Sequence, residues 1–175
     1  MNYLRYLYLF FFLIINSTIS NAQEIKWLTI EEAEEANKKE PKKILIDVYT
    51  DWCGWCKKMD ATTFKDKDLV AYLNQKFYCV KLDGEDKGTL TFKGEEFNFI
   101  NQGRRGYNEL AAGFLKGKMS YPSLVFLGED LVVLQVMKGF KTAEELLPIL
   151  TFLGENIYKN SNWTDYINDT KGEKD

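Results

Sequence analysis

The 175-residue chain contains no histidine, only three cysteines and only three prolines. Without histidine, neither a Ser-His nor a Cys-His catalytic pair can form, and the commonest protein metal ligand is missing. Three cysteines are too few for the disulfide framework of a small secreted domain. The formal net charge of −3 shows no basic surplus, which argues against nucleic acid as a partner.

The N-terminal residues are typical of a targeting segment. Arg5 is the only charged residue before Glu24, and the apolar run at 6–15 is too short to span a bilayer comfortably. Small residues at Ser20 and Ala22 form a cleavage site, so we expect removal of the signal near Ala22 and export, most simply to a bacterial periplasm. The alternative is an uncleaved N-terminal anchor that leaves the protein facing the periplasm.

Composition and patterning predict a single domain. We assign residues 1–22 to the signal peptide, 24–155 to the domain and 156–175 to a polar C-terminal tail whose end is disordered. Capping boxes at Thr29 and Thr142 begin two of the expected helices. Hydrophobic spacing predicts helices over 30–39, 53–62, 66–76, 107–115 and after Thr142. It predicts strands over 44–49, 77–83, 123–127 and 132–136, a hairpin from 89–92 and 96–100, and a loop at 103–106.

Cys53 and Cys56 form a Cys-x-x-Cys sequence between a predicted buried strand and a predicted helix, the layout of a dithiol redox centre. At the helix N-terminus, free amides and the helix dipole stabilise the Cys53 thiolate, which is the form that attacks a disulfide. Cys56, one turn further on, is expected to be more buried and to resolve the mixed disulfide. An inert structural disulfide and half of a zinc site are the alternatives. Zinc needs two further ligands, and only Cys79 remains, which is typical of a small core residue.

The order of elements, with Tyr121-Pro122 before the third core strand, resembles the thioredoxin fold over residues 25–153. Trp52, Cys53, Gly54, Cys56 and Lys57 match the active-site pattern Trp-Cys-Gly-x-Cys-Lys. The resemblance is strongest to exported thioredoxin-like thiol–disulfide oxidoreductases. It implies an α/β fold: a central mixed β-sheet flanked by helices, with an inserted hairpin or loop at 84–118 before a cis-proline.

The resemblance also implies roles for further residues. Asp47 matches a buried carboxylate whose pKa burial raises and which takes the proton of Cys56. Lys81 matches its charge partner, and Pro122 matches the cis-proline. Tyr121 and Pro122 would hold a substrate strand beside Cys53. Asp47 at a strand edge, hydrogen-bonded to backbone, and a trans Pro122 are the plainer alternatives.

Trp52 and Trp55 flank the thiols and would give the site an apolar rim, although core packing explains Trp52 equally well. Trp55 stands where reducing thioredoxins usually carry proline, which leaves the redox direction open. The segment Gly103-Arg104-Arg105-Gly106 is better explained as a solvated loop than as a site for an acidic partner.

These observations predict an exported thiol–disulfide oxidoreductase, with reduction slightly favoured over oxidation or isomerisation. It needs no metal or organic cofactor, since the Cys53–Cys56 disulfide is the redox centre. Its partners would be protein disulfides or dithiols and a membrane electron-transfer protein. The alternative is a non-catalytic binding module that presents Trp55, Tyr121 and the inserted hairpin, with a purely structural disulfide.

Overall fold

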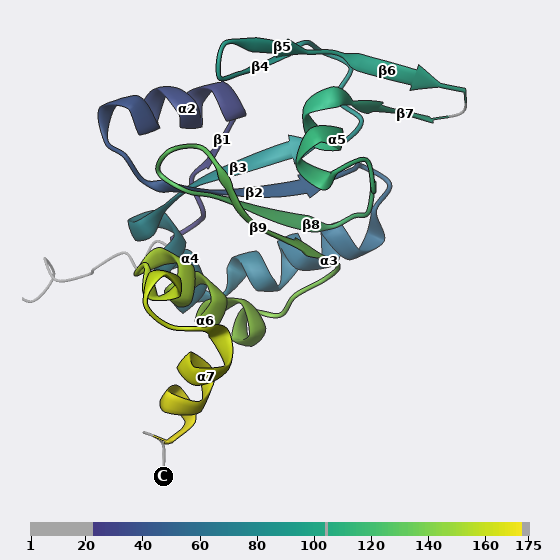
Figure 1. Ribbon diagram of the computed structural model, residues 1–175. Helices are drawn as coiled ribbons and strands as arrows, with labels where there is room; N and C mark the ends of the chain where they lie inside the picture. Colours follow the sequence, from purple (N-terminus) through teal and green to yellow (C-terminus); the bar gives the residue numbers. More distant parts are fainter. Residues whose placement is uncertain (1–22, 104, 173–175) are drawn as a thin grey trace, which may run out of the picture.

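The computed structural model describes residues 23–103 and 105–172, so the predicted signal peptide and Arg104 lie outside the described residues. A five-stranded sheet in the order β1-β3-β2-β8-β9 forms the centre of the molecule (Figure 1). Its strands are β1 (Trp27–Leu28), β2 (Lys43–Tyr49), β3 (Phe77–Asp83), β8 (Ser123–Leu127) and β9 (Val133–Lys138). β1, β2 and β3 run parallel, whereas β8 pairs antiparallel with β2 and β9. The predicted mixed sheet is confirmed.

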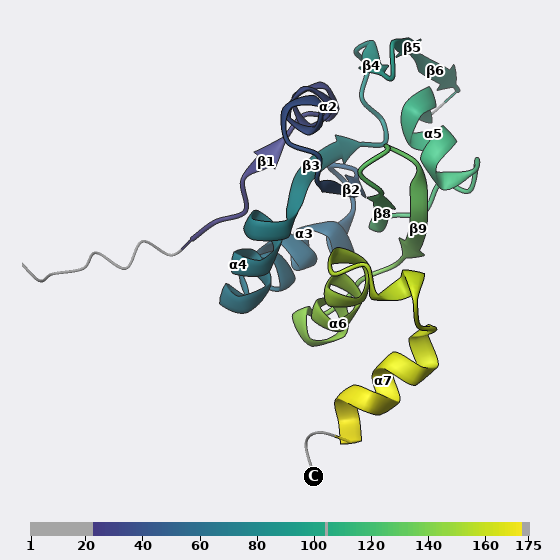
Figure 2. The same ribbon diagram turned by 60° about the vertical axis from the view of Figure 1, so that its left-hand side comes forward.

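Helices cover both faces of this sheet. α2 (Ile30–Lys39) and α5 (Glu109–Leu115) lie on one face, and α3 (Gly54–Ala61), α4 (Lys67–Lys76) and α6 (Ala143–Gly154) lie on the other (Figures 1 and 2). Both predicted capping boxes are present. The hydroxyl groups of Thr29 and Thr142 accept hydrogen bonds from the backbone amides of Glu32 and Glu145, and the carboxylates of those glutamates accept from the backbone amides of the two threonines. A 3₁₀ turn at Thr63–Lys65 joins α3 to α4.

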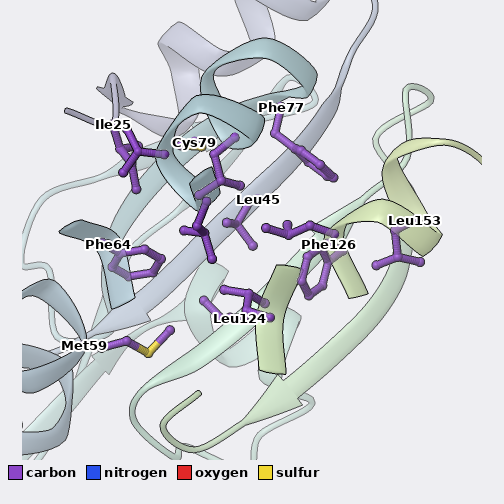
Figure 3. Packing of buried hydrophobic residues seen from close by; sticks show 14 residues of the cluster. Ile25, Leu45, Met59, Phe64, Phe77, Cys79, Leu124, Phe126 and Leu153 are labelled. Carbon is purple, nitrogen blue, oxygen red and sulfur yellow. The ribbon is translucent and has the colours of Figure 1, made fainter. Parts of the chain in front are cut away.

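Strand alternation divides the core into two clusters. Ile44 and Ile46 of β2 point toward α2 and α5, and Leu45 between them points toward α3, α4 and α6. Figure 3 shows the cluster that contains Leu45, to which α3 contributes Met59 and α6 contributes Leu153. Each fully buried Leu, Ile or Phe side chain contributes about 1.5–3 kcal/mol to folding. The face of β2 and β3 that α3 covers is therefore closely packed.

The segment between β3 and α5 forms two hairpins. The first, β4 (Leu90–Phe92) with β5 (Glu95–Phe97), is the predicted hairpin, but its second strand ends at Phe97, and Phe99 and Ile100 belong to the second hairpin. The second, β6 (Phe99–Gln102) with β7 (Arg105–Asn108), was not predicted. Of the loop predicted at 103–106, Gly103 lies in a turn as expected, but Arg105 and Gly106 belong to β7. The next helix begins at Glu109 rather than at Tyr107. A two-stranded hairpin buries little surface, so β6 and β7 leave no clear period-2 pattern in the sequence.

The region assigned to a polar tail also contains structure. A 3₁₀ turn at Ile157–Lys159 and helix α7 (Trp163–Gly172) follow α6. Trp163 and Tyr166 pack their rings against Phe152 of α6, with centroid distances of 5.3 and 5.2 Å. A few aromatic contacts thus dock a helix whose sequence is otherwise polar. No helix among the described residues is long and apolar enough to cross a membrane.

Candidate active site

Cys53 and Cys56 are joined by a disulfide at the N-terminus of α3. Cys53 is the N-cap residue, and its Sγ accepts a hydrogen bond of 3.1 Å from the backbone amide of Cys56. The helix therefore directs one of its free N–H groups at the sulfur that would carry the negative charge after reduction. Cys53 is 5% exposed and Cys56 2% exposed, so the expected order of burial is confirmed.

A chain of charged groups lies on the face of the sheet that α3 covers. Asp47 on β2 and Lys81 on β3 are paired in the parallel register, so both side chains point the same way. The Lys81 Nζ donates a hydrogen bond of 2.6 Å to Asp47 Oδ2, as predicted. The same ammonium group also donates to Oδ1 of Asp60 on α3. Sequence analysis missed Asp60, although its position four residues after Cys56 places it on the same side of the helix as that thiol.

Aromatic rings enclose the ammonium group of Lys81. Its Nζ lies 4.9 Å from the ring centre of Trp27, 5.0 Å from that of Tyr49 and 5.4 Å from that of Phe64. Burial lowers the pKa of Lys81, but Asp47 and Asp60 outweigh that effect and the net pKa is raised. Together with the negative faces of the rings, they keep Lys81 positively charged.

Asp47 is 1% exposed, and burial raises its pKa to about 6. The Lys81 ammonium opposes that rise, and the negative charge of Asp60 adds to it. Within the described part of the chain, Oδ1 of Asp47 has no hydrogen-bond partner. A carboxylate with a pKa near neutrality and an available oxygen is suited to accept and return a proton. Asp47 is therefore not a strand-edge aspartate bonded to backbone.

The peptide bond between Tyr121 and Pro122 is cis, as predicted. The carbonyl oxygen of Pro122 accepts a hydrogen bond of 2.8 Å from the amide of Gly139, which ties this loop to the end of β9. The Tyr121 ring meets the Trp52 ring edge-on, with 5.8 Å between centroids. The cis-proline loop and the Cys-x-x-Cys loop therefore lie side by side.

The two tryptophans form the exposed side of the site. Trp52 is 49% exposed and Trp55 57% exposed, so neither is a core residue. A positively charged side chain lies over each ring. The Arg105 guanidinium is 4.1 Å from the Trp52 ring centre, and the Lys58 Nζ is 4.9 Å from that of Trp55. Trp55 also packs against Phe140, from the loop before α6. The predicted rim is present, and Arg105, Lys58 and Phe140 extend it.

Cys79 takes no part in this arrangement. It is buried in β3, and burial raises the pKa of its thiol to about 12, which suppresses thiolate formation. No cluster of three or more histidine, cysteine, aspartate or glutamate side chains able to hold a metal ion occurs within residues 23–103 and 105–172.

Comparison with known proteins assigns the family. Residues 18–107, about half of the chain, match the family model Thioredox_DsbH, described as "Protein of unknown function, DUF255". The chain belongs to this family. Spermatogenesis-associated protein 20 of Mus musculus is 35% identical over 57 residues, but this match covers 33% of the present chain and only 7% of the mouse protein.

Solved structures confirm the thioredoxin fold. The structure entitled DsbH Oxidoreductase is similar with a TM-score of 0.52, at 20% identity over 73% of this chain and 83% of its own. A thioredoxin-fold protein from Helicobacter pylori gives 0.56, at 13% identity over 86% and 85% of the two chains. A proposed disulphide-isomerase from Bacteroides thetaiotaomicron gives 0.53, at 26% identity over 76% and 95%. This DsbH-family chain is thus a thioredoxin-like protein with a Cys-x-x-Cys disulfide.

Proposed function

We propose that this protein is an exported thiol–disulfide oxidoreductase whose reactive group is the Cys53–Cys56 pair. The observation that carries the proposal is the disulfide at the start of α3, together with Asp47 on the sheet face that this helix covers. Burial raises the pKa of the Asp47 carboxyl group to about 6. The family match and the DsbH-like structural neighbour support it.

In the reducing direction, the Cys53 thiolate attacks one sulfur of a substrate disulfide. A mixed disulfide forms, and the other substrate sulfur leaves as a thiolate that takes a proton from water. Cys56 then gives its proton to Asp47 and attacks Cys53 Sγ, which releases the second substrate thiolate. Two electrons pass to the substrate, the Cys53–Cys56 disulfide forms again, and an external dithiol restores the reduced pair. Oxidation of a substrate dithiol follows the same steps in reverse.

Turnover of a protein disulfide by the wild type, Cys53→Ser and Cys56→Ser tests this chemistry. Cys53→Ser should be inactive, and Cys56→Ser should accumulate a mixed disulfide with the substrate that mass spectrometry detects. Full activity in Cys53→Ser would contradict the proposal.

The direction of electron flow follows from the reduction potential. We favour reduction, for which the protein would draw electrons from a membrane partner. A potential near −270 mV, about that of thioredoxin, supports reduction, whereas one near −120 mV, about that of a strong oxidant, supports oxidation.

Export is the part of the proposal that rests on residues 1–22 and on the Dsb-type relatives. If the signal is cleaved after Ala22, the mature protein begins at Gln23. Intact mass of the protein recovered from a periplasmic fraction measures this directly. A full-length chain in the membrane fraction would indicate the uncleaved anchor instead.

Low exposure of both cysteines favours a second candidate function, a binding module with a structural disulfide. In that case the bond should resist mild reductant, and its loss should mainly lower the melting temperature. Thiol titration against a graded dithiol buffer separates the two functions, because a redox-active pair is reduced well before the protein unfolds.

A further inference from the structure

A hollow of about 350 Å³ lies between the loop before Cys53, the loop before Pro122 and the second hairpin. Trp52, directly before Cys53, forms one wall, and Tyr121, directly before Pro122, forms another. Gln102 and Arg105 of the β6–β7 hairpin close it. A peptide that crosses Cys53 beside Tyr121 would bring a neighbouring side chain to this hollow.

The guanidinium group of Arg105 places a positive charge at the hollow. Its guanidinium stacks on the Trp52 ring, at 4.1 Å from the ring centre, which limits the rotation of an otherwise exposed side chain. Stacking uses the face of the guanidinium and leaves the N–H groups at its edge free to donate. Among the described residues, no carboxylate lies within 4 Å of it to form a salt bridge. The edge of the guanidinium matches the two oxygens of a carboxylate.

Glu85 also lines the hollow, and its position decides whether it competes for Arg105. Its Oε1 accepts a hydrogen bond of 3.1 Å from the indole Nε1 of Trp52, at the edge of the ring. Arg105 lies over the face of the same ring. Trp52 thus holds the two charges at separate places, and Glu85 leaves the N–H groups of Arg105 unpaired.

We propose that this hollow binds the residue flanking the reactive cysteine of a protein substrate, and that Arg105 selects an aspartate or glutamate there. This specificity rests on the proposed function, because the substrate reaches the hollow only when its disulfide lies at Cys53. The hairpin β6–β7, inserted between β3 and α5, is then the element that adapts a thioredoxin-like site to acidic segments.

The test uses reduced protein and three peptides of equal length, each with one internal disulfide. They carry glutamate, glutamine or lysine on both sides of one cysteine. Second-order rate constants for a single turnover are measured with the wild type, Arg105→Gln and Arg105→Glu. The wild type should prefer the glutamate peptide over the lysine peptide by about three- to ten-fold, the range of one partly exposed charge-assisted contact. Arg105→Gln should nearly abolish the preference, and Arg105→Glu should reverse it.

Lys87→Glu provides the matched control. It makes the same charge change on the same inserted segment, at an exposed side chain outside the hollow, and should keep the wild-type order of peptides. High ionic strength should reduce the wild-type preference, because the contact is partly exposed. Circular dichroism of each variant verifies that it is folded.

A small disulfide such as bis(2-hydroxyethyl) disulfide, which carries no charge for Arg105 to bind, separates this inference from the proposed function. If the wild type reduces it but shows no preference among peptides, or if Arg105→Glu keeps the glutamate preference, the inference is overturned and the function stands. If the wild type reduces no disulfide at all, both fail.

Discussion

The two sides of the Cys53–Cys56 disulfide differ in character. On the inner side, Asp47, Lys81 and Asp60 form a chain of hydrogen-bonded charges that runs from the buried Asp47 to the partly exposed Asp60. On the exposed side, the aromatic rings of Trp52 and Trp55 each carry a cation and face solvent. The inner charges are suited to moving a proton at the reactive sulfurs, and the exposed surface is suited to choosing a substrate. Variants on the two sides should therefore change different measured quantities.

The largest effect should come from exchanging the reactive thiol. Cys53→Ser should lower disulfide turnover by at least about a thousand-fold, because a serine hydroxyl does not attack a disulfide. Cys79→Ala, the comparison in the core, should lower stability by about 1 kcal/mol and leave turnover within two-fold, since its thiol is kept protonated by burial. Equal losses in both variants would mean that the disulfide has no catalytic part.

Asp47→Asn should have a large effect on the pH dependence of stability. Burial raises the pKa of Asp47 from 3.8 to about 6, so the folded protein holds this proton more tightly than the unfolded chain. The stability that Asp47 contributes is thus present below pH 3.8 and is lost as the pH rises through 6. Relative to the wild type, Asp47→Asn should gain about 2–3 kcal/mol in its free energy of unfolding between pH 4 and pH 8. Urea denaturation of the oxidised proteins measures this, and a pH-independent difference would contradict it.

Asp60→Asn should have a moderate effect on the pH dependence of the reaction rate and should leave substrate selection unchanged. Without Asp60, the Lys81 ammonium pairs with Asp47 alone, and the repulsion between the two carboxylates disappears. The pKa of Asp47 should fall, so the acidic limb of the rate–pH profile should move down by about half a pH unit. Asp68→Asn, an exposed change of equal charge on α4, is the control. If neither variant shifts the rate–pH profile, Asp60 does not influence the pKa of Asp47 during the reaction.

The smallest effect should come from the rim. Trp55→Ala removes the contacts with Phe140 and Lys58 and should weaken the binding of a protein substrate about two- to five-fold. Because the proton-transfer groups lie on the other side of the disulfide, the midpoint of the rate–pH profile should stay where it is. A shifted midpoint would show that the two sides are coupled.

How far the sequence predicted each side follows from the separation of the contributing residues. Asp47, Cys53 and Cys56 lie within one strand–loop–helix unit, and Lys81 follows on the neighbouring parallel strand, so short spacings and strand register brought them together. Asp60 was within reach of the same reasoning, since four residues after Cys56 is one helical turn. Arg105 was noted only as part of a loop, because nothing local indicates that it reaches Trp52.

The same distinction holds for the fold. Hydrophobic runs and capping boxes predicted four of the five strands of the central sheet and the helices that cover it, because those elements bury enough apolar side chains to leave a periodic pattern. The two-residue strand β1 was not predicted. The β6–β7 hairpin and helix α7 bury only a few side chains, so their sequences are polar, and tertiary contacts with Trp52 and Phe152 decide where they lie. By itself, the sequence determined a thioredoxin-like dithiol and its buried acid. Only the tertiary structure decided that Arg105 lies over Trp52 beside the dithiol, because these two residues are far apart in the chain and no local sequence pattern predicts their contact.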